Sequence, residues 1–168
     1  MIIIVEGIDR VGKTTLCNKL SENYKIPIYR HIGERNFKTI DNDIETEKFF
    51  QILEICKLSN AFIIFDRLYL SDYVYGTLER DYDIIKASNN LKALEDYIGE
   101  SFNNIVLILV CPTDINESSR QHGKDLSKYN EIFMQLFKES NIRNKIMCDY
   151  NGIDNAVKFV GEKIRENI

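Results

Sequence analysis

The stretch from Glu6 to Leu16, EGIDRVGKTTL, combines residue types at a spacing that suits phosphate binding. Its glycines allow backbone amides to wrap around phosphate groups at the start of a helix, and Lys13 supplies a charge for the β- and γ-phosphates. The hydroxyl of Thr14 is a ligand for Mg²⁺. The stretch fits the pattern G-x-x-x-x-G-K-[ST] through Gly7, Gly12, Lys13 and Thr14. It therefore predicts a nucleoside triphosphate site.

A second group of candidate residues lies in FDRLYLSDYVYGTLER, Phe65 to Arg80. Asp66, at the end of an expected strand, suits the coordination shell of Mg²⁺. Arg67 is planar and permanently charged, so it can bind a second phosphate through two hydrogen bonds. The alternative is that the pair only caps the following helix. The presence of a phosphate loop favours the first interpretation.

The same residues argue against a GTPase switch of the Ras type. Such a switch needs Asp-x-x-Gly after the third strand and Asn-Lys-x-Asp for guanine. No glycine follows Asp66 at that spacing, and Asn144-Lys145 is followed by Ile146 and Met147. The switch class is therefore disfavoured.

Strands and helices alternate along the chain. Five short apolar runs predict buried strands at 2–5, 26–29, 61–65, 105–110 and 145–148. Apolar runs without alternation are typical of a parallel sheet that is covered on both faces. Helical stripes lie between the runs, at Leu16, Leu20 and Tyr24; Phe49, Ile52, Leu53 and Cys56; Leu91, Leu94 and Ile98; Ile132, Phe133, Leu136 and Phe137; and Val157, Val160 and Ile164. This order predicts an α/β sandwich of one domain, residues 1–168, whose ligands bind at the carboxyl ends of the strands.

The composition excludes several classes of protein. Of the 168 residues, 44% are apolar and 29% charged, which is ordinary for one globular domain. A net charge of -4 and a pI near 5.3 argue against a general nucleic-acid binder. The cysteines are too scattered for zinc and suit a reducing compartment. The apolar start is too short for a signal peptide, and the run Ile105 to Cys111 is far below the roughly 20 residues of a membrane span. We therefore expect a cytoplasmic protein with no membrane and no nucleic-acid partner.

At its two candidate groups the chain resembles the thymidylate kinase family of P-loop nucleoside monophosphate kinases. The family's first loop reads EGxD followed by GKT or GKS, here Glu6-Gly7-Ile8-Asp9 and Gly12-Lys13-Thr14. Its second motif is Asp-Arg with a downstream serine and tyrosine, here Asp66, Arg67, Ser71 and Tyr75. The order of strands and helices also matches over nearly the whole length. The resemblance implies a P-loop NTPase fold, a three-layer α/β/α sandwich with a five-stranded parallel sheet.

The resemblance also accounts for the two charges in the middle of the loop. The family's loop aspartate reaches the sugar 3′-hydroxyl of the phosphate acceptor and lies near the metal, which implies the same for Asp9. A loop arginine marks one subtype of the family, in which Arg10 would lie between the donor and acceptor phosphates and stabilise the transferred group. Arg30, after the second strand, stands in the place of an arginine that holds the acceptor's 5′-phosphate.

Other positions concern the acceptor's sugar and base. Tyr75 stands where the family often has a tyrosine against the sugar 2′ position, and a core tyrosine is an equal alternative. Asp72 stands where some members have a neutral polar residue facing the base. A carboxylate there could accept hydrogen bonds from an exocyclic amine or simply cap a helix. Leu68 replaces the usual aromatic or histidine, and Phe49 and Phe50 are not clear matches for the family's base-stacking phenylalanine.

The family's mobile lid is expected over residues 118–130, SSRQHGKDLSKYN, which we call the lid segment. Arg120 is its candidate for contacting ATP, by stacking on adenine or by touching a phosphate. We expect His122 and Lys124 to be solvated loop residues.

The implied reaction is ATP-dependent phosphorylation of a deoxynucleoside monophosphate, with dTMP to dTDP as the first expectation. ATP and Mg²⁺ are the implied cofactors, and a homodimer is the family's usual assembly. The residues expected to contact ATP are Gly7, Ile8, Asp9, Arg10, Val11, Gly12, Lys13, Thr14, Thr15 and Arg120. Those expected to contact the acceptor are Asp9, Arg30, Arg67, Ser71, Asp72 and Tyr75. The expected catalytic residues are Arg10, Lys13 and Asp66, and the expected metal ligands are Thr14, Asp66 and Asp9.

Two alternatives stay open at the level of sequence. A deoxynucleoside kinase would phosphorylate a sugar 5′-hydroxyl and would need a carboxylate base, for which Glu34 is the nearby candidate after the second strand. A nucleotide-binding protein without catalysis is the alternative of another class, although the complete set of catalytic side chains favours an enzyme.

Overall fold

The computed structural model describes residues 1–30 and 42–166, and its core is a sheet whose neighbouring strands all run parallel. The five strands lie in the order β2-β3-β1-β4-β5. They are β1 (Ile2–Glu6), β2 (Ile28–Arg30), β3 (Ile63–Asp66), β4 (Ile105–Val110) and β5 (Asn144–Cys148). Each expected strand is present, which confirms the predicted sheet. Glu34 lies outside the described residues.

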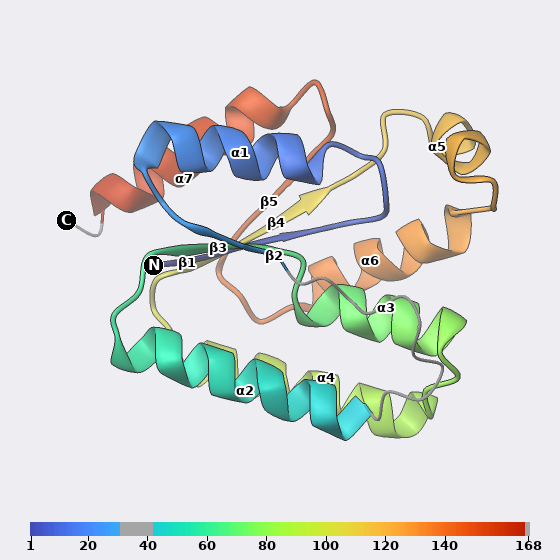
Figure 1. Cartoon of the computed structure of the whole chain (residues 1–168), viewed down its shortest axis with the longest axis horizontal. Coiled ribbons are helices and arrows are strands. Elements are labelled where there is room, and N and C mark those ends of the chain that lie inside the picture. Colours follow the sequence, from blue (N-terminus) through green and yellow to red (C-terminus); the bar gives the residue numbers. More distant parts are fainter. Residues whose placement is uncertain (31–41, 167–168) are drawn as a thin grey trace.

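Helices cover both faces of the sheet. They are α1 (Lys13–Tyr24), α2 (Asn42–Leu58), α3 (Tyr69–Glu79), α4 (Ile84–Ser101), α5 (Ile115–His122), α6 (Ser127–Glu139) and α7 (Ile153–Glu166). Figure 1 shows α1 and α7 on one face, α2, α3, α4 and α6 on the other, and α5 beyond one end of the strands. This is the predicted α/β/α sandwich. Within the described parts of the chain, no helix has the length and apolar character needed to cross a membrane.

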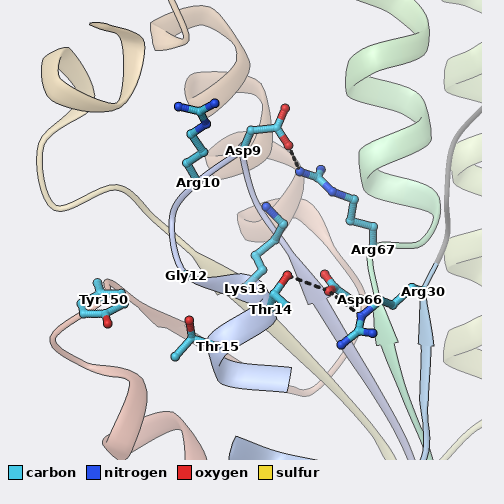
Figure 2. Close-up of a pocket in the computed structure, with 10 residues that line it drawn as sticks. All are labelled: Asp9, Arg10, Gly12, Lys13, Thr14, Thr15, Arg30, Asp66, Arg67 and Tyr150. Carbon is cyan, nitrogen blue, oxygen red and sulfur yellow. Dashed lines mark hydrogen bonds and ion pairs between the residues drawn. The ribbon is translucent and has the colours of Figure 1, made fainter. Parts of the chain in front are cut away.

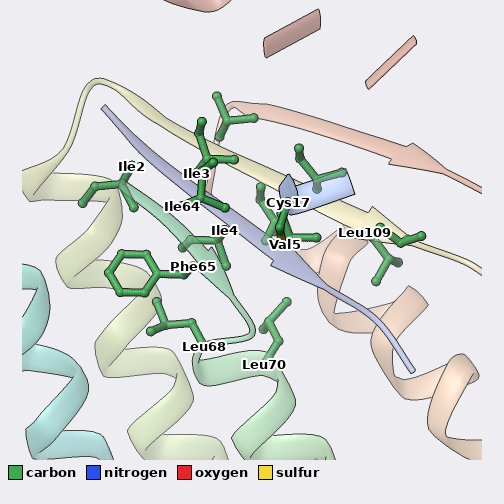
Figure 3. Close-up of a cluster of buried hydrophobic side chains, with 14 of the residues drawn as sticks. Ile2, Ile3, Ile4, Val5, Cys17, Ile64, Phe65, Leu68, Leu70 and Leu109 are labelled. Atoms are coloured by element: carbon green, nitrogen blue, oxygen red, sulfur yellow. The ribbon is translucent and has the colours of Figure 1, made fainter. Parts of the chain in front are cut away.

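The middle strands β1 and β4 are apolar, except for Glu6 at the end of β1, because they face helices on both sides. Every residue of β1 and β4 is buried. Figure 3 shows side chains of β1 and β3 gathered with Leu68 and Leu70, which lie at the N-cap and in the first turn of α3. All four cysteines are free thiols, and three of them are buried. The core therefore continues from the sheet into the segment that carries the second candidate group.

The register of the strands brings the candidate residues to one edge of the sheet. Val5 on β1 lies opposite Asp66 on β3, and Arg30 on β2 lies opposite Asp66 as well. Glu6, the last residue of β1, lies opposite Leu109 on β4. Since all strands run parallel, the phosphate loop, Arg30 and Asp66 meet at the carboxyl edge, as predicted.

The start of α3 is fixed by the buried carboxylate of Glu6. Its Oε1 accepts hydrogen bonds from the backbone N–H groups of Leu68 (2.9 Å) and Leu70 (3.1 Å), and its Oε2 accepts one from the Ser71 hydroxyl. Burial raises the pKa of Glu6, while Ser71 and the nearby Arg67 counteract that rise. Leu68, the N-cap residue of α3, has an apolar side chain that cannot accept a hydrogen bond from the first turn of the helix. A residue of β1 therefore supplies the acceptor that this turn needs.

A second buried carboxylate, Asp72, ties α3 to the turn before α4. Asp72 is 4% exposed, and its Oδ1 accepts hydrogen bonds from Arg80 Nη1 (2.9 Å) and from the Tyr82 hydroxyl (3.3 Å). Burial outweighs the attraction of Arg80 and raises the pKa of Asp72 to about 6. The carboxylate of Asp72 therefore binds Arg80 and Tyr82 inside the protein and is not exposed to solvent.

Replacing Glu6 tests how far α3 depends on it. Glu6→Met keeps a similar length but removes both acceptors, so two backbone N–H groups and a hydroxyl lose their partner in the core. We expect the free energy of unfolding in urea to fall by about 3 kcal/mol or more. Glu6→Gln keeps one acceptor oxygen and should lose clearly less. A Met variant as stable as the wild-type protein would contradict this role.

The raised pKa of Asp72 predicts how stability depends on pH. Between about pH 4 and pH 6 the folded protein holds a proton at Asp72 that the unfolded chain releases, so this group's contribution to stability falls as pH rises. Asp72→Asn does not titrate in this window. The unfolding free energy of the wild-type protein minus that of Asp72→Asn should drop by about 2–3 kcal/mol between pH 4 and pH 7. Urea unfolding of both proteins at pH 4 and pH 7 measures this difference in unfolding free energy. If the difference is the same at the two pH values, the pKa of Asp72 is not raised in the folded protein.

Candidate active site

A cavity of about 530 Å³ lies at the carboxyl edge of the sheet, beside the loop between β1 and α1 (Figure 2). It is lined by Asp9, Arg10, Gly12, Lys13, Thr14, Thr15, Arg30, Asp66, Arg67 and Tyr150. All but Tyr150 are residues that the sequence motifs predict for the site. Figure 2 shows Tyr150 on one side of the phosphate loop and Arg30 and Arg67 on the other. The fold thus gathers the two candidate groups around one space.

The phosphate loop depends on backbone conformations and close approaches that favour glycine. Gly7 has a φ of +137°, and a Cβ there would lie 2.2 Å from the carbonyl oxygen of Val110. Gly12 has a φ of +96° and forms the N-cap of α1. Gly12 has no side chain that could cap α1, and the first turn of α1 carries no acidic residue. The amide groups at the start of α1 can therefore bind an anion.

Lys13 is held inside this loop. It is 6% exposed, and its Nζ donates a hydrogen bond to the carbonyl oxygen of Ile8. Burial, together with the nearby Arg67, lowers the pKa of Lys13 to about 7. A phosphate beside the amine would favour its charged form, because an opposite charge stabilises the ionised state. Lys13 is thus placed for a phosphate in the loop.

Thr14 and Asp66 form a pair that fits the protein's share of a Mg²⁺ shell. Thr14 Oγ1 donates a hydrogen bond to Asp66 Oδ2 (3.1 Å). Mg²⁺ commonly takes one or two protein oxygens and fills its other positions with water and phosphate oxygens. Arg30 Nε lies 3.8 Å from the same Asp66 oxygen, and Arg30 Nη2 donates to Asn18 Oδ1 (3.0 Å). Asp9, the third expected metal ligand, contacts other residues.

Those contacts centre on Arg67. Its guanidinium group donates hydrogen bonds to the Asp9 carboxylate, to Ser71 Oγ (3.1 Å) and to the Gly7 carbonyl oxygen (3.2 Å). It also lies 5.2 Å from the centre of the Tyr75 ring. Arg67 has a φ of 75°, a conformation that residues other than glycine adopt mainly where the surrounding structure imposes it. The second candidate group is therefore joined to the phosphate loop through Arg67 and Asp9.

The lid segment comprises the end of α5, a turn at Gly123 and the start of α6. Arg10 Nη1 donates a hydrogen bond to the Gln121 carbonyl oxygen (2.5 Å), and His122 Nε2 lies 2.9 Å from Asp9 Oδ2. Two adjacent residues of the phosphate loop thus contact two adjacent residues at the end of α5.

The expectation of a solvated loop residue is wrong for His122, which ends α5 and is partly buried, whereas Lys124 lies in the loop after α5 as expected and is partly exposed. Besides the contact of His122 with Asp9, Lys124 forms an ion pair with Glu79 and lies 4.3 Å from the centre of the Tyr129 ring. Arg120 is exposed in the last turn of α5 and does not line the cavity. Both residues lie in the last turn of α5, and the helix directs the side chain of His122, rather than that of Arg120, toward the phosphate loop.

The remaining predicted acceptor residues lie behind the cavity. Ser71 joins Arg67 to Glu6. Tyr75 packs its ring against Phe133, with a centroid distance of 6.2 Å, and its hydroxyl is buried without a hydrogen-bond partner in the described part of the protein. Asp72 is paired with Arg80, as described above. The structure brings Arg30 and Arg67 to the cavity wall but not these three side chains.

Two residues of this region went unassigned in the sequence analysis. Glu6 was visible as an acidic residue that ends an apolar strand, and a buried carboxylate must find donors. Tyr150 lies in the segment between β5 and α7, and its ring is the nearest contact that a Cβ at Gly12 would meet, at 2.8 Å. Its position after the last strand was the available signal, because that strand also ends at the carboxyl edge.

Comparisons with known proteins bear on the fold of the chain. No protein-family model matches the chain. The sequence is 29% identical over 141 residues to the SPbeta prophage-derived uncharacterized protein YorR of Bacillus subtilis (strain 168), a match that covers 82% of this chain and 80% of that protein. The crystal structure of YorR in complex with phosphorylated GDP is similar with a TM-score of 0.72 at 23% identity, over 98% of this chain and 96% of YorR.

Two enzymes of known activity share the fold at lower similarity. A structure of deoxyadenosine kinase from M. mycoides with products dCMP and dCDP gives a TM-score of 0.57 at 14% identity, over the full length of both chains. Thymidylate kinase from Ehrlichia chaffeensis gives 0.58 at 18% identity, over 95% of this chain and 97% of that one. The chain therefore has the three-layer fold of the P-loop nucleotide kinases.

Proposed function

We propose that this protein transfers the γ-phosphoryl group of ATP to a deoxynucleoside monophosphate, with dTMP as the first acceptor to test. The observation that carries the proposal is the arrangement of cations around one cavity. Lys13 lies in the phosphate loop, while Arg30 and Arg67 lie on the opposite wall. Two sets of positive charge suit two phosphorylated ligands, one donor and one acceptor.

The donor triphosphate would bind the amides at the start of α1 and Lys13. Mg²⁺, when bound through Thr14 and Asp66, would neutralise charge on the phosphates. Tyr150 offers an aromatic face beside Gly12, which suits the donor base, and the exposed Arg120 remains a candidate for a second contact with ATP. Arg10 donates a hydrogen bond to the Gln121 carbonyl oxygen in this structure. On releasing that contact it would lie between the two phosphates and stabilise the charge that the transferred group develops.

The acceptor would bind with its phosphate on Arg67 and Arg30 and its sugar hydroxyl on Asp9. Ser71 and Tyr75 would support Arg67 from behind. No general base is needed, because a monophosphate oxygen is already a competent nucleophile. We expect the protein to work as a homodimer, following the resemblance described above.

The base of the acceptor decides which monophosphates are tested beside dTMP. The resemblance to thymidylate kinases favours dTMP, whereas YorR holds phosphorylated GDP and the M. mycoides enzyme holds dCMP. Asp72 would affect the choice only if the acceptor displaced Arg80 from it, since the two side chains form an ion pair.

A deoxynucleoside kinase is the rival, and the neighbouring deoxyadenosine kinase gives it weight. Such an enzyme would need a carboxylate free to take a proton from a sugar 5′-hydroxyl. In the described part of the chain, both carboxylates that line the cavity already contact arginines, Asp9 with Arg67 and Asp66 with Arg30. This arrangement favours an anionic acceptor.

The proposal is tested by incubating the protein with ATP-Mg²⁺ and each nucleoside or monophosphate in turn, followed by chromatography of the products. We expect a diphosphate from at least one deoxynucleoside monophosphate, at a rate within the roughly 1–100 s⁻¹ usual for kinases. Lys13→Met should fold normally by circular dichroism and lose transfer by at least about a hundredfold, because it removes charge stabilisation in the transition state.

The other outcomes separate the rivals. Products from nucleosides alone would replace the proposal with a deoxynucleoside kinase. Binding of ATP without any transfer would indicate a nucleotide-binding protein. Normal turnover by Lys13→Met would show that the chemistry lies elsewhere.

A further inference from the structure

Asp9 is held by two residues that come from different segments of the chain. Its Oδ1 contacts Arg67 at the end of β3, and its Oδ2 lies 2.9 Å from His122 Nε2 at the end of α5. A carboxylate can only accept hydrogen bonds, so His122 Nε2 must carry a hydrogen. The imidazole of His122 is therefore a donor to Asp9 whatever the state of its other nitrogen.

The other nitrogen, His122 Nδ1, is buried without a hydrogen-bond partner in the described part of the protein. A buried polar atom of this kind costs about 1–3 kcal/mol relative to one that is paired or hydrated. Exposing the ring to water would remove that cost. Unpaired buried groups call for an explanation beyond stability, and function is a common one.

The end of α5 fixes where His122 lies. Gly123 takes a left-handed conformation with a φ of 75°, and its N–H donates to the carbonyl oxygens of Ser119 and Arg120, which closes the helix directly after His122. Ser119 Oγ in turn accepts a hydrogen bond from the Leu126 N–H (2.9 Å). The contact of Arg10 with Gln121 adds a second link to the phosphate loop. The imidazole is thus presented to Asp9 from an ordered helix end.

We infer that His122 is a positioning residue, which orients the Asp9 carboxylate for the sugar 3′-hydroxyl of the acceptor. The inference rests on the proposed function, in which Asp9 contacts that hydroxyl. A carboxylate has about four acceptor positions, so Arg67 and His122 leave room for one more donor. With both oxygens held, Asp9 loses little rotational freedom when the hydroxyl binds, and this preorganisation favours binding.

The test compares His122→Ala with His122→Gln on two acceptors. The acceptors are the preferred deoxynucleoside monophosphate and its 3′-deoxy analogue. The Ala variant loses the donor to Asp9, whereas the amide Nε2 of Gln can replace the imidazole Nε2. With the natural acceptor, His122→Ala should raise KM for the acceptor about tenfold, the size of one hydrogen bond of about 1.4 kcal/mol. The KM for ATP should stay within about twofold, and His122→Gln should recover most of the loss.

The 3′-deoxy acceptor distinguishes positioning from a structural role. It lacks the hydroxyl that Asp9 would bind, so wild-type protein and His122→Ala should use it with equal KM. An equal loss on both acceptors, or a natural acceptor KM that does not change in His122→Ala, would overturn the inference while the proposed function stands. If the wild-type protein phosphorylates no monophosphate at all, the proposed function fails and the inference fails with it.

Discussion

The carboxylate of Glu6 connects the centre of the sheet to the active-site wall, and the rest of the site depends on it. It binds two backbone N–H groups and a hydroxyl at the start of α3, from a fully buried position at the end of β1. Arg67 precedes that start directly and takes a left-handed conformation there. Because Arg67 then contacts Asp9, and Asp9 contacts His122, one buried group sets the positions of residues on three further segments.

The site's charges are balanced by one another within the protein. Arg67 faces Asp9, Arg30 faces Asp66, and Lys13 donates to a backbone carbonyl in its own loop. Each cation is thus positioned before a ligand arrives, and each has a partner that a phosphate can replace. Such preorganised charges need little rearrangement when negative charge develops on a transferred phosphoryl group. This arrangement gives a physical basis for the proposed transfer between two phosphorylated ligands.

The sequence predicts those features that depend on local patterns. The strands were found because β4 is apolar at every position and β1 is apolar at every position before Glu6, and the phosphate loop because its residues are contiguous. Two helices gave no apolar stripe: α3 buries residues on several sides, and α5 buries none. The contact between Asp9 and His122 joins residues 113 positions apart, and no local pattern signals it. His122 faces the phosphate loop in place of the predicted Arg120, because α5 ends directly after His122.

A crystal structure with a non-hydrolysable ATP analogue, Mg²⁺ and the acceptor monophosphate would show where each phosphate binds. We expect the triphosphate on the amides of residues 7–14, with Lys13 turned from the Ile8 carbonyl to a phosphate oxygen. We also expect the acceptor's phosphate on Arg67 and Arg30. A triphosphate bound away from the loop, or an acceptor whose phosphate contacts neither arginine, would contradict the proposed binding of donor and acceptor.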